Sequence, residues 1–250
     1  MNREEIFAQL KQRYPKAIAL HELNQNWPNV LDHCLIEAAR ADIFAKLLGF
    51  SAELRDDLVT ASLVHDAYKR QEVEAIKAES SIGGTGMEAE IRANDTALAQ
   101  LAEQKFSDRV IRLVGLVGGG APVVLEIQRI IDQEAHTEEE LAALVVHYID
   151  NYTRDSDPVT PAIQESGIWI NDIDRRARAN MAKQQYAGID TEWKKQYAHD
   201  QRFAGKNSFE VMVMVSRKIE NVLMNHLSHA VTQNSGVVQL PELIERSLAQ

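Results

Sequence analysis

The sequence predicts an all-α protein. Apolar side chains recur every three or four residues through most of the chain, which is the period of an amphipathic helix. Helix start and stop signals frame several of these stretches, whereas strand-like alternation is rare and short. The 250 residues are enough for one large helical domain, or for a core domain with a helical extension.

The first helices are expected at recognisable boundaries. A short amphipathic segment opens the chain, and its apolar positions are Ile6, Phe7, Leu10 and Tyr14. A second helix should begin near Pro28, because proline is favoured in a first turn, and should end at Gly49. Ser51 can cap a third helix, which we expect to run through His65 and Tyr68 with both side chains on its apolar face.

Turn-forming residues punctuate the middle of the chain. Residues 79–87 (ESSIGGTGM) predict a loop, because three glycines and two serines in nine residues disfavour a helix. Helical patterns resume at 89–104 and 108–117 and are broken by the run GGGAP. Thr137 and Glu140 form a capping box (T-x-x-E), which predicts the start of a helix over LAALVVHYID.

The C-terminal part predicts a helical extension. A turn-rich link at 155–161 leads into a polar region and then a long helix at about 208–231. We therefore expect a metal-binding helical domain over 1–155 and a helical extension over 156–250, packed on the same core. The apolar side of the long helix could pack within the chain or against a second subunit in a homodimer; its positions are Val211, Val215, Ile219, Val222 and Leu223.

Composition limits the classes of partner. The net charge is −10 and no run is rich in Lys or Arg, which argues against binding to long nucleic acid. The acidic charge does not exclude nucleotides as ligands, because a bound divalent cation can supply local positive charge. Cys34 is the single cysteine, so no disulfide can form within the chain. With no signal-peptide pattern and no apolar stretch long enough for a membrane span, we expect a cytoplasmic protein.

Four residues suggest a metal site. His33 lies within the second expected helix, His65 and Asp66 are adjacent within the third, and Asp150 closes the LAALVVHYID helix. Two imidazoles and two carboxylates, with further positions open to water, suit Mn, Fe, Co, Ni or Mg better than a closed structural Zn site. Asp66 follows an apolar run. Burying an aspartate in such surroundings is costly unless a partner such as a metal ion compensates its charge.

These residues carry a resemblance to a known family. The pattern H…HD…D, with LVTASLVHDAYKR around the dyad, resembles the HD-domain superfamily of metal-dependent phosphohydrolases over residues 25–155. The resemblance implies an HD-domain helical bundle with the metal at its centre, held by His33, His65, Asp66 and Asp150. No histidine lies between His65 and His136, where many members hold a second metal, so we expect one divalent ion.

The implied reaction is hydrolysis of a small, nucleotide-like phosphate ester or anhydride by water that the metal activates. Asp66, Lys69 and Glu72 are the candidate catalytic residues, and Lys69, Arg70 and Arg40 are candidate phosphate contacts. Some HD proteins have lysine where Lys69 stands, whereas others have an acid–base carboxylate there. A regulatory module that senses a nucleotide without turnover is the main alternative, and a non-haem iron oxygenase is a third.

Several other residues have simpler interpretations. Lys69 could equally be a solvated surface lysine. His147, three residues before Asp150, suits a supporting or surface role better than ligation, and Cys34 suits a buried core thiol. The aromatic residues Trp169, Tyr186, Trp193 and Tyr197 are interpreted as packing for the extension. His226 and His229, one turn apart, lack an evident carboxylate or cysteine partner and are interpreted as incidental.

Overall fold

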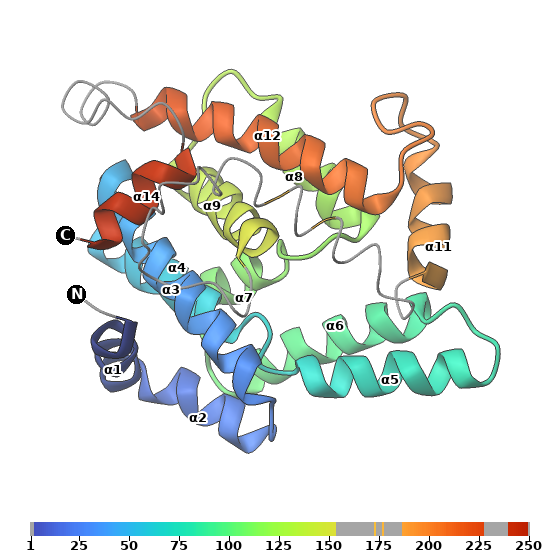
Figure 1. Ribbon diagram of the computed structural model, residues 1–250, viewed down its shortest axis with the longest axis horizontal. Coiled ribbons are helices and arrows are strands. Elements are labelled where there is room, and N and C mark those ends of the chain that lie inside the picture. The colour runs from blue at the N-terminus through green and yellow to red at the C-terminus, as the bar shows by residue number, and fades with distance from the viewer. Residues whose placement is uncertain (1–2, 154–172, 174–176, 178–186, 228–239, 250) are drawn as a thin grey trace.

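The protein is all-α, as the sequence predicts (Figure 1). The computed structural model describes residues 3–153, 173, 177, 187–227 and 240–249, and these residues contain no strand. The helices are α1 (Arg3–Arg13), α2 (Pro15–Leu23), α3 (Pro28–Leu48), α4 (Ala52–Val64), α5 (Lys69–Ser81), α6 (Met87–Glu103), α7 (Asp108–Val114), α8 (Ala121–Ile131), α9 (Glu138–Tyr152), α11 (Ala187–Tyr197), α12 (Ser208–Leu227) and α14 (Leu240–Ala249).

Helices α3, α4 and α9 form the centre of the bundle, since each packs against the other two. Helix α9 is buried almost continuously from Leu141 to Tyr152. A helix that is apolar on nearly every side belongs in the interior of a bundle, surrounded by other helices. This central position of α9 brings its C-terminal turns close to both α3 and α4.

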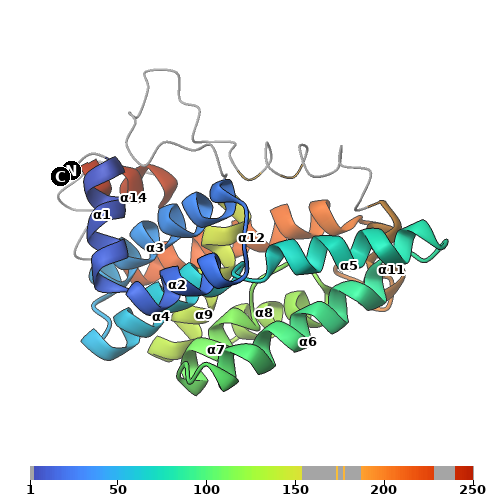
Figure 2. The same ribbon diagram turned by 90° about the horizontal axis from the view of Figure 1, so that it is seen from below.

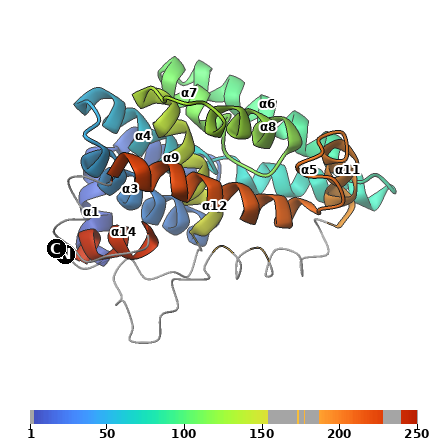
Figure 3. The same cartoon turned by 90° about the horizontal axis from the view of Figure 1, so that it is seen from above.

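The remaining helices surround this centre. Helices α1 and α2 pack on α3 and α4, and α14 returns to α3. Helix α12 lies across α8 and α9 (Figure 3). Helices α5 and α6 form a pair that projects from the bundle (Figure 2), and α11 contacts α6, α8 and α12. No helix among the described residues has the length and apolar character needed to cross a membrane.

Several predicted boundaries are confirmed. Pro28 opens α3, and Gly49 ends it with a φ of 72°, a left-handed conformation that glycine adopts without strain. The Ser51 hydroxyl accepts a hydrogen bond from the Leu54 amide at 3.3 Å and caps α4. The capping box of Thr137 and Glu140 is complete at the start of α9.

The prediction that the third helix runs through His65 and Tyr68 is wrong. Helix α4 ends at Val64, and residues 65–68 form a turn before α5 begins at Lys69. Side chains from the α2–α3 region bind backbone carbonyl oxygens at this end. His21 Nε2 lies 2.7 Å from the Leu63 oxygen, and Asn26 donates to the Asp66 oxygen at 2.7 Å. These bonds satisfy carbonyls that a continued helix would have used.

Other boundaries differ by smaller amounts. Helix α5 extends to Ser81 and α6 begins at Met87, so the loop predicted over 79–87 is shorter. The helix predicted over 108–117 ends at Val114. The sequence pattern does not predict α2, α8, α11 or α14, nor α5 as a separate helix. The link at 155–161 and the predicted end of the long helix at 228–231 lie outside the described residues.

The apolar side of α12 packs within the chain. Four of its five predicted apolar positions have no exposed surface; they are Val211, Val215, Ile219 and Leu223. These side chains face α8 and α9, on which α12 lies. Their burial accounts for the amphipathic pattern without a second subunit, and a homodimer stays a prediction.

A buried ion pair links α14 to helix α3 at the centre of the bundle. Arg40 on α3 and Glu245 on α14 both have no exposed surface, and Arg40 Nε donates to Glu245 Oε1 at 2.8 Å. Tyr152 also donates to Glu245 Oε1, at 2.9 Å, and Arg40 Nη1 donates to Thr153 Oγ1 at 2.7 Å. The pair therefore joins α3, α14 and the end of α9.

Removing one member of this pair should destabilise the fold strongly. We expect Glu245→Gln or Arg40→Ala to lower the free energy of unfolding by about 3–5 kcal/mol, because the remaining charge stays buried. The double variant Arg40→Met/Glu245→Leu should recover most of the loss. Denaturant titrations followed by circular dichroism test this. As the control, Glu74→Gln, which removes the exposed Arg70–Glu74 pair, should change stability by less than about 0.5 kcal/mol.

Candidate metal centre

Side chains from the three central helices converge on one point. His33 lies on α3, His65 is the residue after α4, and Asp150 lies in the last turns of α9. Together with Glu37, one turn after His33, they offer ligand atoms that all lie within 4.8 Å of one another. Three of the four predicted ligands therefore meet in a group that could hold a metal ion.

Asp66, the fourth predicted ligand, lies beside this group. Its Oδ2 is 3.6 Å from His65 Nε2. Asp150 Oδ1 lies 3.9 Å from the same nitrogen and 3.6 Å from His33 Nε2. Two ligands of one ion, each ~2.1 Å from it, are separated by ~3.0–4.2 Å in an octahedral or tetrahedral arrangement. The observed separations fall in that range, so His33, His65 and Asp150 fit a shared divalent ion, and Asp66 lies at a suitable distance from His65.

The orientation of His65 favours ligation. Its Nδ1 lies 3.0 Å from the Ser62 carbonyl oxygen, which can only accept, so Nδ1 carries the proton. The lone pair is then on Nε2, which is buried and has no hydrogen-bond partner. Metal-binding histidines commonly donate their other ring nitrogen to a carbonyl in this way. An unsatisfied buried acceptor is costly, and a cation at Nε2 would remove that cost.

Asp66 is held in its ionised form. Burial alone would raise the pKa of this carboxyl, but Lys69, His65 and His33 together lower it. The Lys69 ammonium lies 3.5 Å from Asp66 Oδ1. An ionised carboxylate is the form that a divalent metal requires. The end of α4 at Val64 places this side chain in a turn and not on the flank of a helix.

Glu37 is a member of the cluster that the sequence analysis missed. It has no exposed surface, and its Oε1 lies 2.8 Å from His33 Nε2 while its Oε2 lies 3.5 Å from His65 Nδ1. Neither oxygen makes a hydrogen bond of suitable geometry. A signal was present in the sequence, because Glu37 follows His33 by four residues and stands within the apolar run LIEAA.

The three side chains predicted to contact phosphate make different contacts in the structure. Lys69, at the start of α5, donates to Glu72 at 3.1 Å as well as lying near Asp66. Arg70 points to the α2–α3 connection, where it bonds the Gln25 carbonyl oxygen at 3.0 Å. Arg40 is buried and bonded to Glu245 and Thr153, so its guanidinium is not available to a substrate and the role expected of it is not supported.

Other candidates have structural roles. His147 is only 1% exposed, and its Nδ1 lies 2.9 Å from the Leu116 oxygen, which excludes a surface role. Cys34 is a buried thiol, as expected. Trp193 and Tyr197 are buried in the packing between α11 and its neighbours, as expected. Trp169, Tyr186 and His229 lie outside the described residues.

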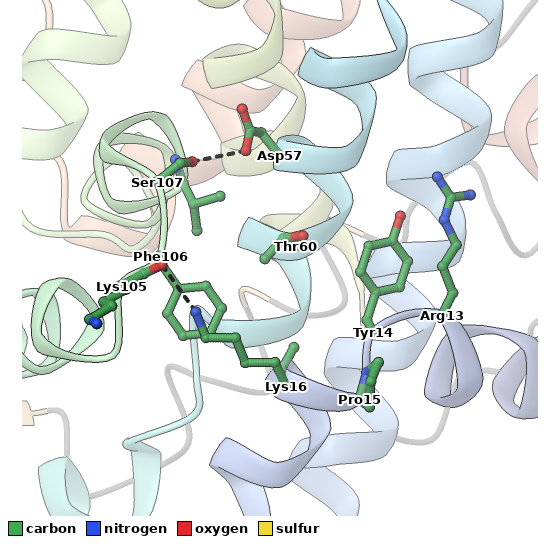
Figure 4. A pocket seen from close by; sticks show the side chains of 11 residues that line it. Arg13, Tyr14, Pro15, Lys16, Asp57, Thr60, Lys105, Phe106 and Ser107 are labelled. Atoms are coloured by element: carbon green, nitrogen blue, oxygen red, sulfur yellow. Dashed lines mark hydrogen bonds between the residues drawn. The ribbon is translucent and has the colours of Figure 1, made fainter.

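A separate hollow of about 240 Å³ lies between the start of α2 and the α6–α7 connection (Figure 4). Lys16 crosses it to donate to the Lys105 carbonyl oxygen at 3.0 Å and lies over the Phe106 ring. None of the residues of the candidate metal centre lines this hollow. The two features are therefore distinct.

Comparison of the chain with protein-family models, with curated proteins and with solved structures gives no match. The residues and their geometry alone point to the metal centre.

The cluster should bind a divalent transition metal through His65. We expect His65→Ala to weaken the binding of Mn²⁺, Co²⁺ or Ni²⁺ at this centre by about 100-fold or more, because a ligand is lost. Glu37→Gln should weaken it by about 10–100-fold, as loss of a supporting carboxylate does. Calorimetric titration and metal analysis after dialysis measure both effects. The exposed His199→Ala is the control, and undiminished binding by His65→Ala would contradict the assignment.

Glu90 should make stability depend on pH. Burial first, and then the Glu72 carboxylate, raise the pKa of Glu90 from 4.5 to about 7. Between these values the folded protein binds more protons than the unfolded chain, so Glu90 lowers stability as the pH rises from about 4.5 to 7. The upper bound is ~1.4 kcal/mol for each pH unit between the two pKa values.

We therefore expect Glu90→Gln to be more stable than the parent protein at pH 8 and similar to it near pH 4.5. The amide oxygen can still accept the bond that Trp193 Nε1 donates to Glu90 at 3.2 Å. Thermal melts across this pH range provide the measurement. Glu88→Gln, at an exposed position of the same helix, should leave the pH profile unchanged.

Proposed function

We propose that the protein is a metal-dependent phosphohydrolase of the HD type, acting on a small nucleotide-like phosphate ester or anhydride. One observation carries the proposal. His33, His65 and Asp150 approach one another in the centre of the bundle, Asp66 lies 3.6 Å from His65, and the Lys69 ammonium lies 3.5 Å from Asp66. Metal ligands next to a fixed cation are what phosphoryl chemistry requires.

The chain's own residues can divide the work of hydrolysis. A divalent ion held by His33, His65, Asp66 and Asp150 would supply Lewis acidity and water of lowered pKa. Asp66 is ionised and could accept a proton. The Lys69 ammonium could pair with a phosphate oxygen, because charge-assisted bonds to phosphate are strong.

Glu72 is the candidate proton donor. Burial is the main reason why its pKa is raised, although Lys69 opposes the effect. A carboxyl with a raised pKa can retain a proton at a pH where ordinary glutamates have lost theirs. Lys69 donates to both Glu72 oxygens, at 3.1 and 3.2 Å, and so fixes the carboxyl between the metal centre and α6.

The preference for a nucleotide-like substrate follows from the HD resemblance. The acidic net charge of −10 argues against long nucleic acid as the substrate. It is compatible with a small phosphate compound that is neutralised locally by the metal and Lys69.

Glu37 favours a second candidate function, a regulatory HD module that binds a nucleotide without turnover. Its carboxylate lies 2.8 Å from His33 Nε2, the atom expected to hold the metal. If Glu37 joined the other four ligands, an octahedral ion would keep a single open position. A site closed in this way suits sensing better than catalysis, since catalytic sites keep positions open for water and substrate.

The proposal is tested by phosphate release from a panel of nucleotides and sugar phosphates with Mn²⁺, Co²⁺, Ni²⁺ or Mg²⁺. We expect release that chelator abolishes. Asp66→Ala and the isosteric Asp66→Asn should lower kcat/KM by about 10³-fold, because metal binding and proton transfer are both impaired. Lys69→Met should lower it by about 10²-fold.

Lys77→Met is the matched control, because Lys77 is an exposed lysine two turns further along α5, and it should keep full activity. Circular dichroism checks that each variant is folded. Metal-loaded protein that releases no phosphate but gains thermal stability from a nucleotide would favour the regulatory module instead. Activity that needs iron and O₂ would indicate the oxygenase.

A further inference from the structure

Two histidines that are far apart in the sequence meet at the edge of the bundle. His136 lies in the connection between α8 and α9, and His226 lies in the last turn of α12 (Figure 1). His226 Nε2 is 3.4 Å from His136 Nδ1, and the ring centroids are 5.5 Å apart. His226 is exposed and His136 is partly buried, so ions in solution can reach the pair.

The proton on His136 can be placed. Its Nε2 lies 3.0 Å from the Ile130 carbonyl oxygen, which can only accept, so Nε2 is the donor. Nδ1 therefore carries a lone pair directed toward His226. This arrangement, in which one ring nitrogen is held by a carbonyl and the other is open, is the usual support of a metal-binding histidine.

The separation of the two nitrogens matches a shared metal ion. Two nitrogens each ~2.05 Å from one tetrahedral ion lie ~3.4 Å apart. The 3.4 Å observed is longer than the ~2.7–3.2 Å typical of bonds donated by N–H groups. The pair would therefore bind an ion with little movement of either ring.

The surrounding helices hold the pair in place. Helix α12 packs on both α8 and α9, so the elements carrying the two rings are fixed before any ion binds. The Glu140 carboxylate interacts electrostatically with His136 and adds negative potential. Among the described residues, only the central cluster contains three or more grouped ligands, so none of them adds a third protein ligand to this pair.

We propose that His136 and His226 form a second, peripheral metal site that chelates a divalent transition ion of the Ni²⁺, Cu²⁺ or Zn²⁺ class. Neutral imidazoles suit these ions, whereas Mg²⁺ and Ca²⁺ prefer oxygen ligands. The site is exchangeable because water fills its remaining positions, and a bound ion joins the end of α12 to the α8–α9 connection. It does not depend on the proposed hydrolase activity.

Calorimetric titration of the full chain with Ni²⁺ tests the site. Compared with the parent protein, His136→Ala and His226→Ala should each bind one Ni²⁺ fewer, or bind that ion at least about tenfold more weakly, because the chelate is lost. The exposed His199→Ala should bind as the parent does. The difference between parent and variant counts this site whatever number the central cluster holds.

Thermal melts give a second readout. Ni²⁺ added in excess should raise the Tm of the parent more than that of either variant, since an ion that binds only the folded state stabilises it. A parent protein whose Ni²⁺ count is unchanged by His226→Ala would overturn the proposal. Loss in only one of the two variants would also overturn it, because a single histidine would then account for the binding.

Discussion

The end of helix α4 is the constraint on which the candidate metal centre depends. His21 and Asn26, from the α2–α3 region, form hydrogen bonds to the carbonyl oxygens of Leu63 and Asp66. Asn26 Nδ2 also lies 3.2 Å from His21 Nδ1, so the two side chains hold each other in position. The helix therefore stops after Val64, and the chain turns. On a continuing helix, adjacent side chains would diverge by ~100°. In the turn, His65 Nε2 and Asp66 Oδ2 come within 3.6 Å.

Burial of charge explains the composition of the cluster. Glu37 has no exposed surface, and it lies on α3 among side chains that are equally buried. A buried carboxylate is tolerated only when it is paired or coordinates a metal. His33 and His65 approach Glu37, and Asp150 approaches the same two rings from α9. A divalent cation shared by these two carboxylates and two imidazoles would compensate their burial in the centre of an apolar bundle.

Local signals account for what could be predicted from the sequence. The all-α fold and the starts of α3, α4 and α9 follow from periodicity and from Pro28, Ser51 and Thr137, which act within a few residues of themselves. The end of α4 could not be predicted, because the bonds that stop it come from residues about 40 positions away. The phosphate contact expected of Arg40 is not supported for a similar reason. Its partner Glu245 lies 205 residues further on, so the pairing could not be predicted without the fold.

The position of Glu37 links the fold to the choice between catalysis and sensing. His33 Nε2 lies 2.8 Å from Glu37 Oε1 and 3.6 Å from Asp150 Oδ1. A metal at His33 Nε2 must displace Glu37 from that nitrogen or accept it as a ligand. Displacement would leave Glu37 near His65 Nδ1, already 3.5 Å from its other oxygen, where it would support the histidine as a neighbouring carboxylate does. Because that position needs only a small shift of one carboxylate, the open coordination that hydrolysis requires is compatible with this packing.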